Sequence, residues 1–453
     1  MKICHAASSL CVFSLLVTPP ASASLSLPEV AARAMGNSPE VRIKLHQYLG
    51  AEADVALARA GFFPQAELSH VSGREQSTGD GPTRMQRQSE RWAWSLNLTQ
   101  NLFSGFQTVY SLRQQDHAKT ARYYQLLDVS EQQALEAVRA YLDVMRQREL
   151  LQAARTNHDS HRRIYQKIRS KVRPDSGVAV AAGVDLEQAG GRLALAEANL
   201  LTVEANLADV SARYARIVGE APPARLQPYR APKAPEDRAI QPGDTPAVRA
   251  ALAAVQAARQ QVQVRRGAFL PRVDARARQE WGRLNAGPVG RDRSRAIIEL
   301  STVLNLSRGG ADKAQLQRAA EDLNAALAQQ DKSCREVRQQ VQMAQTELDK
   351  LQRKLSFLRQ HALASEKVRD AYWDQFEISK RSLLDVLDSE NEFFRSRSAL
   401  IDGETDLVMS QLRLQAAAGR LLGVLGIAPA RPAPETPAGE PGERVCSGEG
   451  SEV

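Results

Sequence analysis

One stretch of the chain, from Ala311 to Asp402, contains neither glycine nor proline, and it restricts the possible folds more than any other feature. From Leu316 to Ala362 its apolar residues recur at alternating spacings of three and four, with Gln330 as the one polar residue of the series. That spacing predicts a coiled-coil seam of about seven heptads, with polar side chains over the rest of the surface. At about 1.5 Å per residue, a helix from Ala311 to about Gln375 is roughly 100 Å long, which argues against a compact domain.

The composition of the chain supports long helices that pack along seams. Aromatic residues make up only 5% of the 453 residues, whereas Ala, Leu, Gln, Glu and Arg dominate, as they do in long helices. The net charge of +8 comes from basic residues that alternate with acidic ones along the predicted helices. A nucleic-acid partner is therefore not expected.

The N-terminus has the pattern of a secretory signal peptide over residues 1–23. Lys2 provides the charged region, residues 10–17 form a short apolar core, and Ala21-Ser22-Ala23 is a small-residue cleavage site. The apolar core is too short to span a bilayer as a helix, and no other apolar run approaches the roughly 20 residues that are required. We therefore expect the mature chain to contact a membrane only through strands.

The chain has four cysteines, and their positions predict neither a disulfide nor a metal site. Cys4 and Cys11 belong to the signal peptide, and Cys11 lacks the small-residue context of a lipid-attachment site. Cys334 falls on the apolar seam and is interpreted as a small packing residue. Cys446 lies in a tail, residues 428–453, whose Pro, Gly and Glu content predicts disorder.

The chain contains two copies of one layout. Residues 37–42 open a helical stretch that ends at 61–64, and the same pattern returns 207 residues later, from 244–249 to 267–271. Each copy places a proline at the helix start behind an Asn/Asp and Ser/Thr cap, and a second proline beyond the helix end. This duplication predicts two structural halves.

The two repeats are expected at residues 24–219 and 244–427, with a proline-rich linker at 220–243 between them. Each repeat is predicted to contain a helix, two strands, one long helix and one helix of intermediate length. The helices expected after the strands cover residues 106–173, 185–219, 311–375 and 385–423. Because two shorter helices together approach the length of one long helix, we expect them to stack end to end beside it.

Short segments with strand periodicity follow the first helix of each repeat. Apolar and polar residues alternate over 91–103 and 295–307, and the expected partner strands at 65–73 and 272–282 alternate more weakly. Segments of about ten residues with one apolar and one polar face are typical of transmembrane barrel strands; soluble hairpins are the alternative. Four strands cannot close a barrel, so we expect a cyclic oligomer with an aqueous lumen.

Three tryptophans stand near the ends of these segments. Trp92 and Trp94 lie at one end of segment 91–103, and Trp281 lies at one end of segment 272–282. Aromatic rings at such positions anchor strands at membrane interfaces, and ligand binding is the alternative. The polar segments 74–90 and 283–294, between the paired strands, predict exposed loops.

This plan resembles the TolC family of bacterial outer-membrane channel proteins over about residues 25–427. The resemblance rests on the duplication, on the passage from Leu98 to Gly105, and on small turn residues at Gly219 and Gly423. It implies a mainly α fold with a small β part: a trimeric α-helical tunnel continued by a 12-stranded outer-membrane β-barrel, with four strands per chain. It also implies docking on an inner-membrane ABC transporter and a periplasmic adaptor (membrane fusion) protein of a Gram-negative bacterium.

By the same resemblance, Asp385 and Asp388 ring the narrow periplasmic entrance of the channel. Arg381 matches the family's arginine that bonds an aspartate of the first repeat, here Asp185. Phe376 stands where the family has a tyrosine, so one hydrogen bond of this lock is expected to be absent or replaced. Aspartates crowded at a constriction attract cations and repel anions; the alternative is that Asp385 only caps a helix and that Arg381 is solvated.

Residues 184–189 and 192–200 look most like the type I secretion branch of this family, which exports large unfolded proteins such as toxins or adhesins. Two alternatives stay open: the outer membrane channel of a multidrug efflux pump and, from another class, a soluble periplasmic coiled-coil adaptor or scaffold. No enzyme constellation is found. His158 and His161 lie three apart without a third ligand nearby, which favours exposed helix histidines over a metal site.

Overall fold

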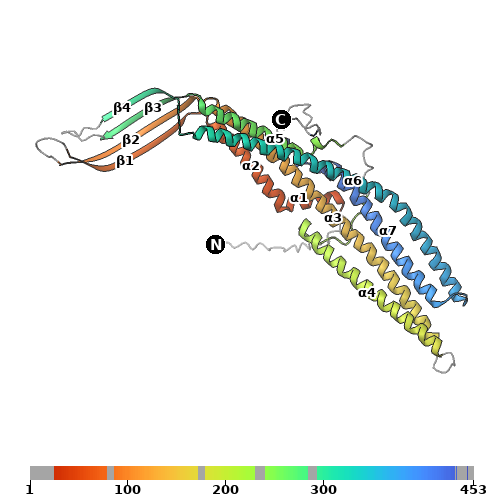
Figure 1. Cartoon of the computed structure of the whole chain (residues 1–453). Coiled ribbons are helices and arrows are strands. Elements are labelled where there is room, and N and C mark those ends of the chain that lie inside the picture. Colours follow the sequence, from red (N-terminus) through yellow and green to blue (C-terminus); the bar gives the residue numbers. More distant parts are fainter. Residues whose placement is uncertain are drawn as a thin grey trace, which may run out of the picture.

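A computed structural model of the chain describes residues 25–78, 86–171, 179–229, 240–283, 293–433, 435 and 446. The predicted signal peptide and most of the predicted tail lie outside these described residues. The molecule is elongated (Figure 1): four strands occupy one end, and helices extend from them to the opposite end, here called the helical tip.

The elements follow the two repeats in order. The helices of the first repeat are α1 (Leu27–Asn37), α2 (Pro39–Ala60), α3 (Gln107–Lys171) and α4 (Ala179–Val218). Those of the second repeat are α5 (Pro246–Arg266), α6 (Ala311–Glu377), α7 (Leu383–Ala417) and α8 (Leu421–Val424). The strands are β1 (Gln65–Thr78), β2 (Gln86–Phe103), β3 (Arg272–Arg283) and β4 (Arg293–Val303), and the short 3-10 helices η1 (Pro242–Asp244) and η2 (Gly267–Phe269) flank α5.

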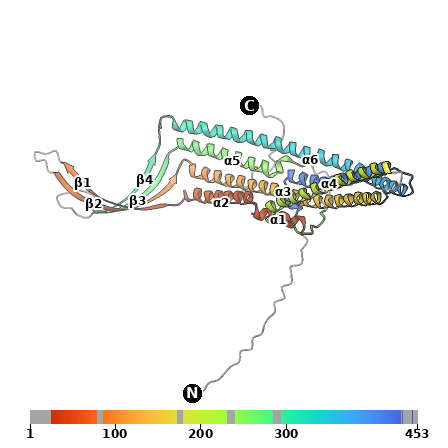
Figure 2. The same cartoon turned by 90° about the horizontal axis from the view of Figure 1, so that it is seen from below.

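The helices form a single curved layer instead of a bundle around one core. Near the sheet, α6, α5, α3 and α2 lie side by side in this order (Figure 2), and each packs on the next. Toward the helical tip, α7 follows α5 and packs between α6 and α3, and α4 follows α2 and packs on α3. The predicted fold class, mainly α with a small β part, is confirmed.

The shorter helices meet end to end at two places. At the first junction, where α4 meets α2, the Asn37 side-chain amide donates to the Val218 carbonyl at 2.8 Å. Gly219 leaves α4 there with φ +92°. At the second junction, where α7 meets α5, a Cβ on Gly419 would lie 2.3 Å from the Pro246 ring. Each long helix is thus flanked by a stacked pair of shorter helices, as their lengths predict.

The four strands form one antiparallel sheet in sequence order, and its two faces differ. One face carries exposed apolar side chains from all four strands: Leu68, Leu96, Leu98, Trp281, Ile298 and Leu300. The other face carries polar and charged side chains: Glu67, Asn97, Thr99, Arg276, Arg278 and Glu299. The predicted alternation of apolar and polar residues is therefore present in the folded sheet.

The strand ends differ from the prediction in both directions. β1 and β2 stay paired beyond the predicted ends, through Arg74 with Glu90 and out to Thr78 with Gln86. Backbone pairing does not depend on apolar side chains, so a polar segment that was expected to be loop continues the ladder. β4 ends at Val303, before the predicted end at residue 307.

The largest apolar cluster of the described residues lies at the first junction and combines α1, α3, α4, α7 and α8. Tyr141 is fully buried at its centre, and its hydroxyl donates to the Leu25 carbonyl at 3.1 Å and to the Gln227 carbonyl at 2.5 Å. Leu25 also pairs with Leu226 in a parallel bridge. Leu25, just before α1, and residues 226 and 227, beyond the end of α4, therefore cover this junction together.

Three expectations about single residues are wrong. Cys334 and Cys446 form a disulfide, with Cα atoms 5.6 Å apart; spacing rules gave no hint because the two are 112 residues apart in the sequence. His161 is fully buried, not exposed, because it lies on the side of α3 that packs on α7. Gly423 lies inside α8, and the left-handed residue that ends this region is Gly426, with φ +67°.

Three further differences concern helices. Sequence analysis did not predict α1, although Ser26 and Glu29 form a capping box at its start. α4 begins at Ala179, six residues before the predicted start at residue 185. Thr245 does not cap α5 with its side chain; its hydroxyl donates to the Pro242 carbonyl at 2.8 Å instead.

Candidate functional site at the helical tip

The helical tip brings together the ends of α3, α4, α6 and α7, at the opposite end of the molecule from the sheet (Figure 1). A small apolar cluster, here called the tip cluster, joins α3, α4 and α7. Its buried members are Ile164, Ile168, Ala189, Leu383, Val386 and Leu387. The aromatic residues near the end of α6 are only partly buried against it. Few apolar side chains therefore hold the tip together.

The turn from α6 to α7 positions Asp385. It contains no glycine, and Ser379 takes the left-handed conformation with φ +58° while the Lys380 amide donates to the Gln375 carbonyl at 2.9 Å. Ser382 then caps α7: its hydroxyl accepts from the Asp385 amide at 3.2 Å and donates to the Asp385 carboxylate at 2.7 Å. The carboxylate lies in the first turn of α7, where the helix dipole favours a negative charge.

Arg381 is held by groups of its own hairpin. Its guanidinium lies 4.1 Å from the centre of the Tyr372 ring, and its Nε donates to the Gln375 amide oxygen at 3.1 Å. Its Nη1 lies 3.8 Å from the Asp385 carboxylate. Within the described part of the chain, no hydrogen bond or ion pair joins Arg381 to Asp185. The link between these two residues therefore stays a prediction, and it would have to form between subunits or in another state.

Asp388 makes an ion pair that joins the two repeats. Arg192 of α4 donates to the Asp388 carboxylate at 2.6 Å. A second pair joins the long helices: Lys167 of α3 lies 2.8 Å from the Glu377 carboxylate of α6. Sequence reasoning missed both pairs, since the partners lie about two hundred residues apart and single-sequence charge patterns reveal only neighbours along one helix.

Phe376 lies in the apolar surroundings of the tip cluster. Its ring centre is 6.3 Å from that of Trp373, and the two planes are tilted by 43°. The Lys167 ammonium lies 5.0 Å from the Trp373 ring centre, so the aromatic pair is part of the same contact between α3 and α6. Phe376 lacks the hydroxyl of the family's tyrosine. Apolar packing and the cation–π contact of Lys167 with Trp373 are found at this position instead.

A polar layer follows the tip cluster along α3 and α7. The Asn157 side chain donates to the Glu390 carbonyl at 3.5 Å, and both residues are buried. Burial raises the pKa of the Glu390 carboxyl, against the opposing effect of Arg369. Burial lowers the pKa of His161, which lies beside Asn391. Buried polar groups hold two helices less firmly than close-packed apolar ones.

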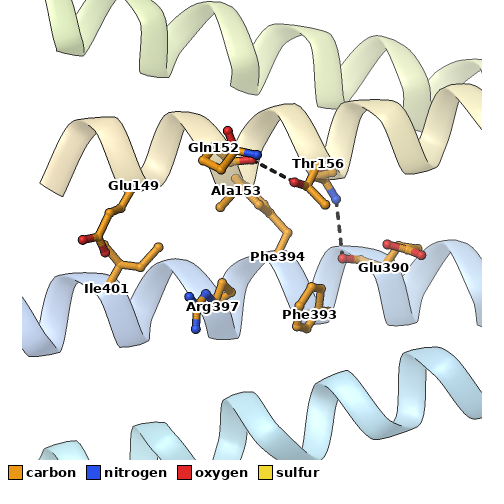
Figure 3. Close-up of a pocket in the computed structure, with 10 residues that line it drawn as sticks. Glu149, Gln152, Ala153, Thr156, Glu390, Phe393, Phe394, Arg397 and Ile401 are labelled. Carbon is orange, nitrogen blue, oxygen red and sulfur yellow. Dashed lines mark hydrogen bonds between the residues drawn. The ribbon is translucent and has the colours of Figure 1, made fainter. Parts of the chain in front are cut away.

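A pocket of about 450 Å³ opens beside this layer, between α3 and α7 (Figure 3). Its lining mixes aromatic and charged side chains: Glu149, Gln152, Ala153, Thr156, Asn157, Glu390, Phe393, Phe394, Arg397 and Ile401. Phe394 points from α7 toward α3, and Glu149 faces the pocket from α3. Burial raises the pKa of the Glu149 carboxyl, and the nearby Glu404 adds to this effect. The α3–α7 contact is therefore imperfectly filled just above the tip.

The predicted anchors lie at the other end of the molecule. Trp94 of β2 and Trp281 of β3 face each other in the register, and their side chains are 38% and 36% exposed. The His70 ring lies 4.4 Å from the Trp94 ring. Trp92 is half-buried on the same face of β2. The three tryptophans thus gather on the apolar face of the sheet, and their role at a membrane interface stays a prediction.

Comparison with known proteins decides the family. The family described as "Outer membrane efflux protein" matches residues 30–220 and 243–420. The chain belongs to this family. In addition, it is 25% identical over 376 residues to the outer membrane efflux protein BepC of Brucella suis, covering 82% of this chain and 80% of BepC.

Solved structures confirm the fold. The outer-membrane channel OprN superposes with a TM-score of 0.76 at 20% identity, covering 87% of this chain and 90% of OprN. The Campylobacter jejuni outer membrane channel CmeC gives a TM-score of 0.76 at 14% identity, covering 90% of this chain and 87% of CmeC. The predicted TolC-type fold is confirmed, and the family description confirms the predicted outer-membrane location.

Membership in this family of channels also agrees with the prediction that the protein is not an enzyme. Membership in the outer membrane efflux family argues against the alternative of a soluble periplasmic adaptor or scaffold. A search of the described helices for a stretch long and apolar enough to cross a membrane finds none.

Proposed function

We propose that three copies of this chain form an outer-membrane exit channel. The observation that supports this proposal is that the sheet and the helical layer both end in edges that have no partner within the described part of the chain. β1 and β4 are the edges of the sheet. Near the strands, α6 and α2 form the two sides of the helical layer (Figure 2), and α4 continues the α2 side toward the helical tip (Figure 1). In a ring of copies, β4 pairs with β1 of the next subunit and α6 packs on the next α2 and α4. Closing the ring satisfies the edge strands, which otherwise invite aggregation.

The two faces of the sheet support an assignment of inside and outside. Ile298 is 89% exposed in the single chain, on the face that also carries the exposed leucines. This face would contact outer membrane lipid, and the face with Thr99, Arg276 and Glu299 would line a water-filled lumen. Outer membrane lipid is thus a proposed partner, in addition to the other two subunits.

Substitutions on the two faces test this assignment. Ile298→Asp places a charge in lipid, so it should strongly reduce the amount of trimer recovered from the outer membrane. Thr99→Asp adds the same charge on the proposed lumen face and should leave assembly intact. If both variants assemble equally well, or if the purified protein is a monomer, the proposed channel is wrong.

At the helical tip, we place the entrance of the channel, with Asp385 and Asp388 as its charged ring. Within one subunit, Arg381 holds Asp385 and Arg192 holds Asp388. The proposed closed state adds a link from Arg381 to Asp185, with Phe376 packed beside it. We expect the double substitution Arg381→Ala with Asp185→Ala to raise the single-channel conductance of the reconstituted trimer. An unchanged conductance would count against the lock.

The exported substrate is proposed to be a large unfolded protein, in type I secretion with an inner-membrane ABC transporter and a periplasmic adaptor. The support is the sequence of α4 near its start, residues 184–200, which looks most like that branch. Deletion of the gene should abolish secretion of one large protein and leave drug susceptibility unchanged.

A second candidate is the outer membrane channel of a multidrug efflux pump, which is favoured by the name of the relative BepC as an efflux protein. In that case the deletion strain should become sensitive to several drugs while its secreted proteins stay the same. The two measurements on one strain separate the candidates, because each expects a loss where the other expects none.

A further inference from the structure

The disulfide between Cys334 and Cys446 has no part in the proposed export function, and it carries a separate inference. These are the two cysteines that follow the predicted signal peptide. Cys334 belongs to α6, whereas Cys446 lies close to the C-terminus. The bond closes a covalent loop that contains the last part of α6, the turn at the helical tip, all of α7 and α8.

The bond is placed at the second junction. Cys334 is buried in an apolar cluster with Val248, from the start of α5, and Leu414, from the end of α7. Cys446 is half-buried against the same cluster. The Arg338 guanidinium, one turn along α6, also donates to the Cys446 carbonyl at 2.7 Å. A covalent bond and a hydrogen bond therefore both hold Cys446 on α6.

The first junction shows why such a fixation is useful. There, α1 and the start of the linker cover the meeting point of α4 and α2, and they contribute Leu27, Val30 and Leu226 to a large apolar cluster. At the second junction, the cluster is smaller, and its additional cover comes from Ile240 and Cys446. A disulfide compensates for a small apolar cluster by restricting the unfolded chain.

We propose that oxidation after export forms a covalent strap at the second junction, the bond that ties Cys446 to Cys334 of α6. In this step the two thiols lose two protons and two electrons and form one S–S bond. The electrons pass to the disulfide of a thiol-oxidising protein of the exported compartment, which becomes a dithiol. The strap holds the base of the α6–α7 hairpin. The helical tip, at the far end of the same hairpin, is held by noncovalent contacts alone.

The α6–α7 hairpin therefore has one end that is covalently fixed, at the second junction, and one end that is not, at the helical tip. Breaking the bond should loosen the C-terminal end of α7, near Leu414, and the start of α5, near Val248. It should leave the N-terminal end of α7, near Leu387, unchanged, because the tip cluster does not include the strap.

Thiol labelling and hydrogen exchange on the full-length mature protein, purified from outer membranes, test the strap. Without reductant, neither cysteine should react with a maleimide in denaturant, and a Cys334–Cys446 peptide should be found by mass spectrometry. In Cys446→Ser and in reduced wild type, amide exchange should increase in residues 407–417 and 246–255 and stay the same in 383–390. The melting temperature of the helices should fall by the same amount in both.

Cys334→Ser provides a second variant with the same expected exchange pattern, although it also alters the apolar cluster. The proposal fails if both thiols label without reductant, or if exchange in residues 407–417 is the same with and without the bond. Either result leaves the export channel untouched, because that proposal is tested by trimer assembly and conductance.

Discussion

At both the first junction and the helical tip, α3 contacts α4 and α7, but the two regions are built in opposite ways. At the first junction, large side chains such as Tyr141, Tyr214 and Leu412 are completely buried. At the tip, the aromatic residues of α6 are only partly buried, and the ion pair between Arg192 and Asp388 is open to solvent. The same helices are therefore fixed firmly at one level and loosely at another.

This difference fits a channel that opens at one end. Movement of α7 relative to α3 at the tip would break a small apolar cluster and a few ion pairs. Exposed ion pairs each contribute little to the stability of the folded state. The same movement at the first junction would expose a large apolar surface.

The strongest test removes the centre of the first junction. Tyr141→Ala leaves a cavity among buried residues and should lower the free energy of unfolding by about 3–5 kcal/mol. Tyr141→Phe keeps the ring but leaves the Leu25 and Gln227 carbonyls without the hydroxyl donor. This variant should lower the free energy of unfolding by about 1–3 kcal/mol. Denaturant unfolding followed by circular dichroism measures both. Equal losses in the two variants would mean that the hydrogen bonds, and not the packing, stabilise the junction.

Glu131 provides a pH test of the same region. Its carboxylate is buried and accepts hydrogen bonds from the Leu421 amide at 3.0 Å and the Leu422 amide at 3.4 Å, at the start of α8. Burial raises the pKa of Glu131 from 4.5 to about 7. Between these values the folded state keeps a proton that the unfolded state has lost. Stability should therefore fall as the pH rises through this window, by roughly 3 kcal/mol.

Glu131→Gln keeps the hydrogen-bond acceptor of this site but cannot ionise. The free energy of unfolding of this variant should change much less between pH 4.5 and about 7 than that of the wild type. Denaturant unfolding at several pH values gives the comparison. If wild type and variant depend on pH in the same way, the buried carboxyl does not control the stability of the junction.

The sequence predicted the architecture well because its signals were local. The glycine- and proline-free stretch from Ala311, the capped starts at Pro39 and Pro246, and the alternation over residues 91–103 each follow from rules that act within one element. The errors have local causes too. α1 was missed despite its capping box, and the ends of β1 and β2 continue as strand because backbone pairing tolerates polar side chains.

The candidate site was predicted less completely, for a different reason. Ser382 and Asp385 are neighbours in sequence, so a helix cap at this point could be foreseen. The partners Arg192 and Asp388 meet only after the two repeats fold against each other, and the same is true of the disulfide to Cys446. The burial of His161 also depends on which side of α3 faces α7, and that side was not fixed by the periodicity of α3.

His161 provides a pH test of the helical tip. The stability of the tip should depend on pH with the opposite sign to that of the first junction. It is fully buried near the tip cluster, and the groups that face it are Asn391 of α7, Arg192 of α4 and His158 of α3. Burial lowers the pKa of His161 below its usual value of 6.5, so below about pH 6.5 the unfolded state binds a proton that the folded state does not. Stability of this region should therefore fall as the pH falls, whereas that of the first junction rises.

Hydrogen exchange, corrected for the intrinsic effect of pH, measures the two regions in one sample. Acidification below about pH 6.5 should increase exchange in α7 at residues 386–394 and not in α8 at residues 421–424. His161→Leu should remove the acid response of α7, and His158→Gln, three residues away, serves as the control that keeps it. An acid response of the same sign in both regions would break the contrast.

The smallest expected effect on stability concerns the ion pair between Arg192 and Asp388. The two side chains are 32% and 56% exposed, so a double-mutant cycle with Arg192→Ala and Asp388→Ala should give a coupling energy of no more than about 1 kcal/mol. The pair between Arg359 and Glu404, at 3.1 Å between α6 and α7 and away from the tip, is the matched control. Its coupling energy should be similar.

Conductance then separates the two pairs. If the tip is the releasable entrance, Arg192→Ala should raise the single-channel conductance of the reconstituted trimer, because it frees α7 from α4 where few other contacts hold them. Arg359→Ala should leave the conductance unchanged, although it also removes an ion pair that is open to solvent. A rise in both variants would mean that any loosening of the helical wall opens the channel, and the contrast between a fixed junction and a releasable tip would not describe how this protein works.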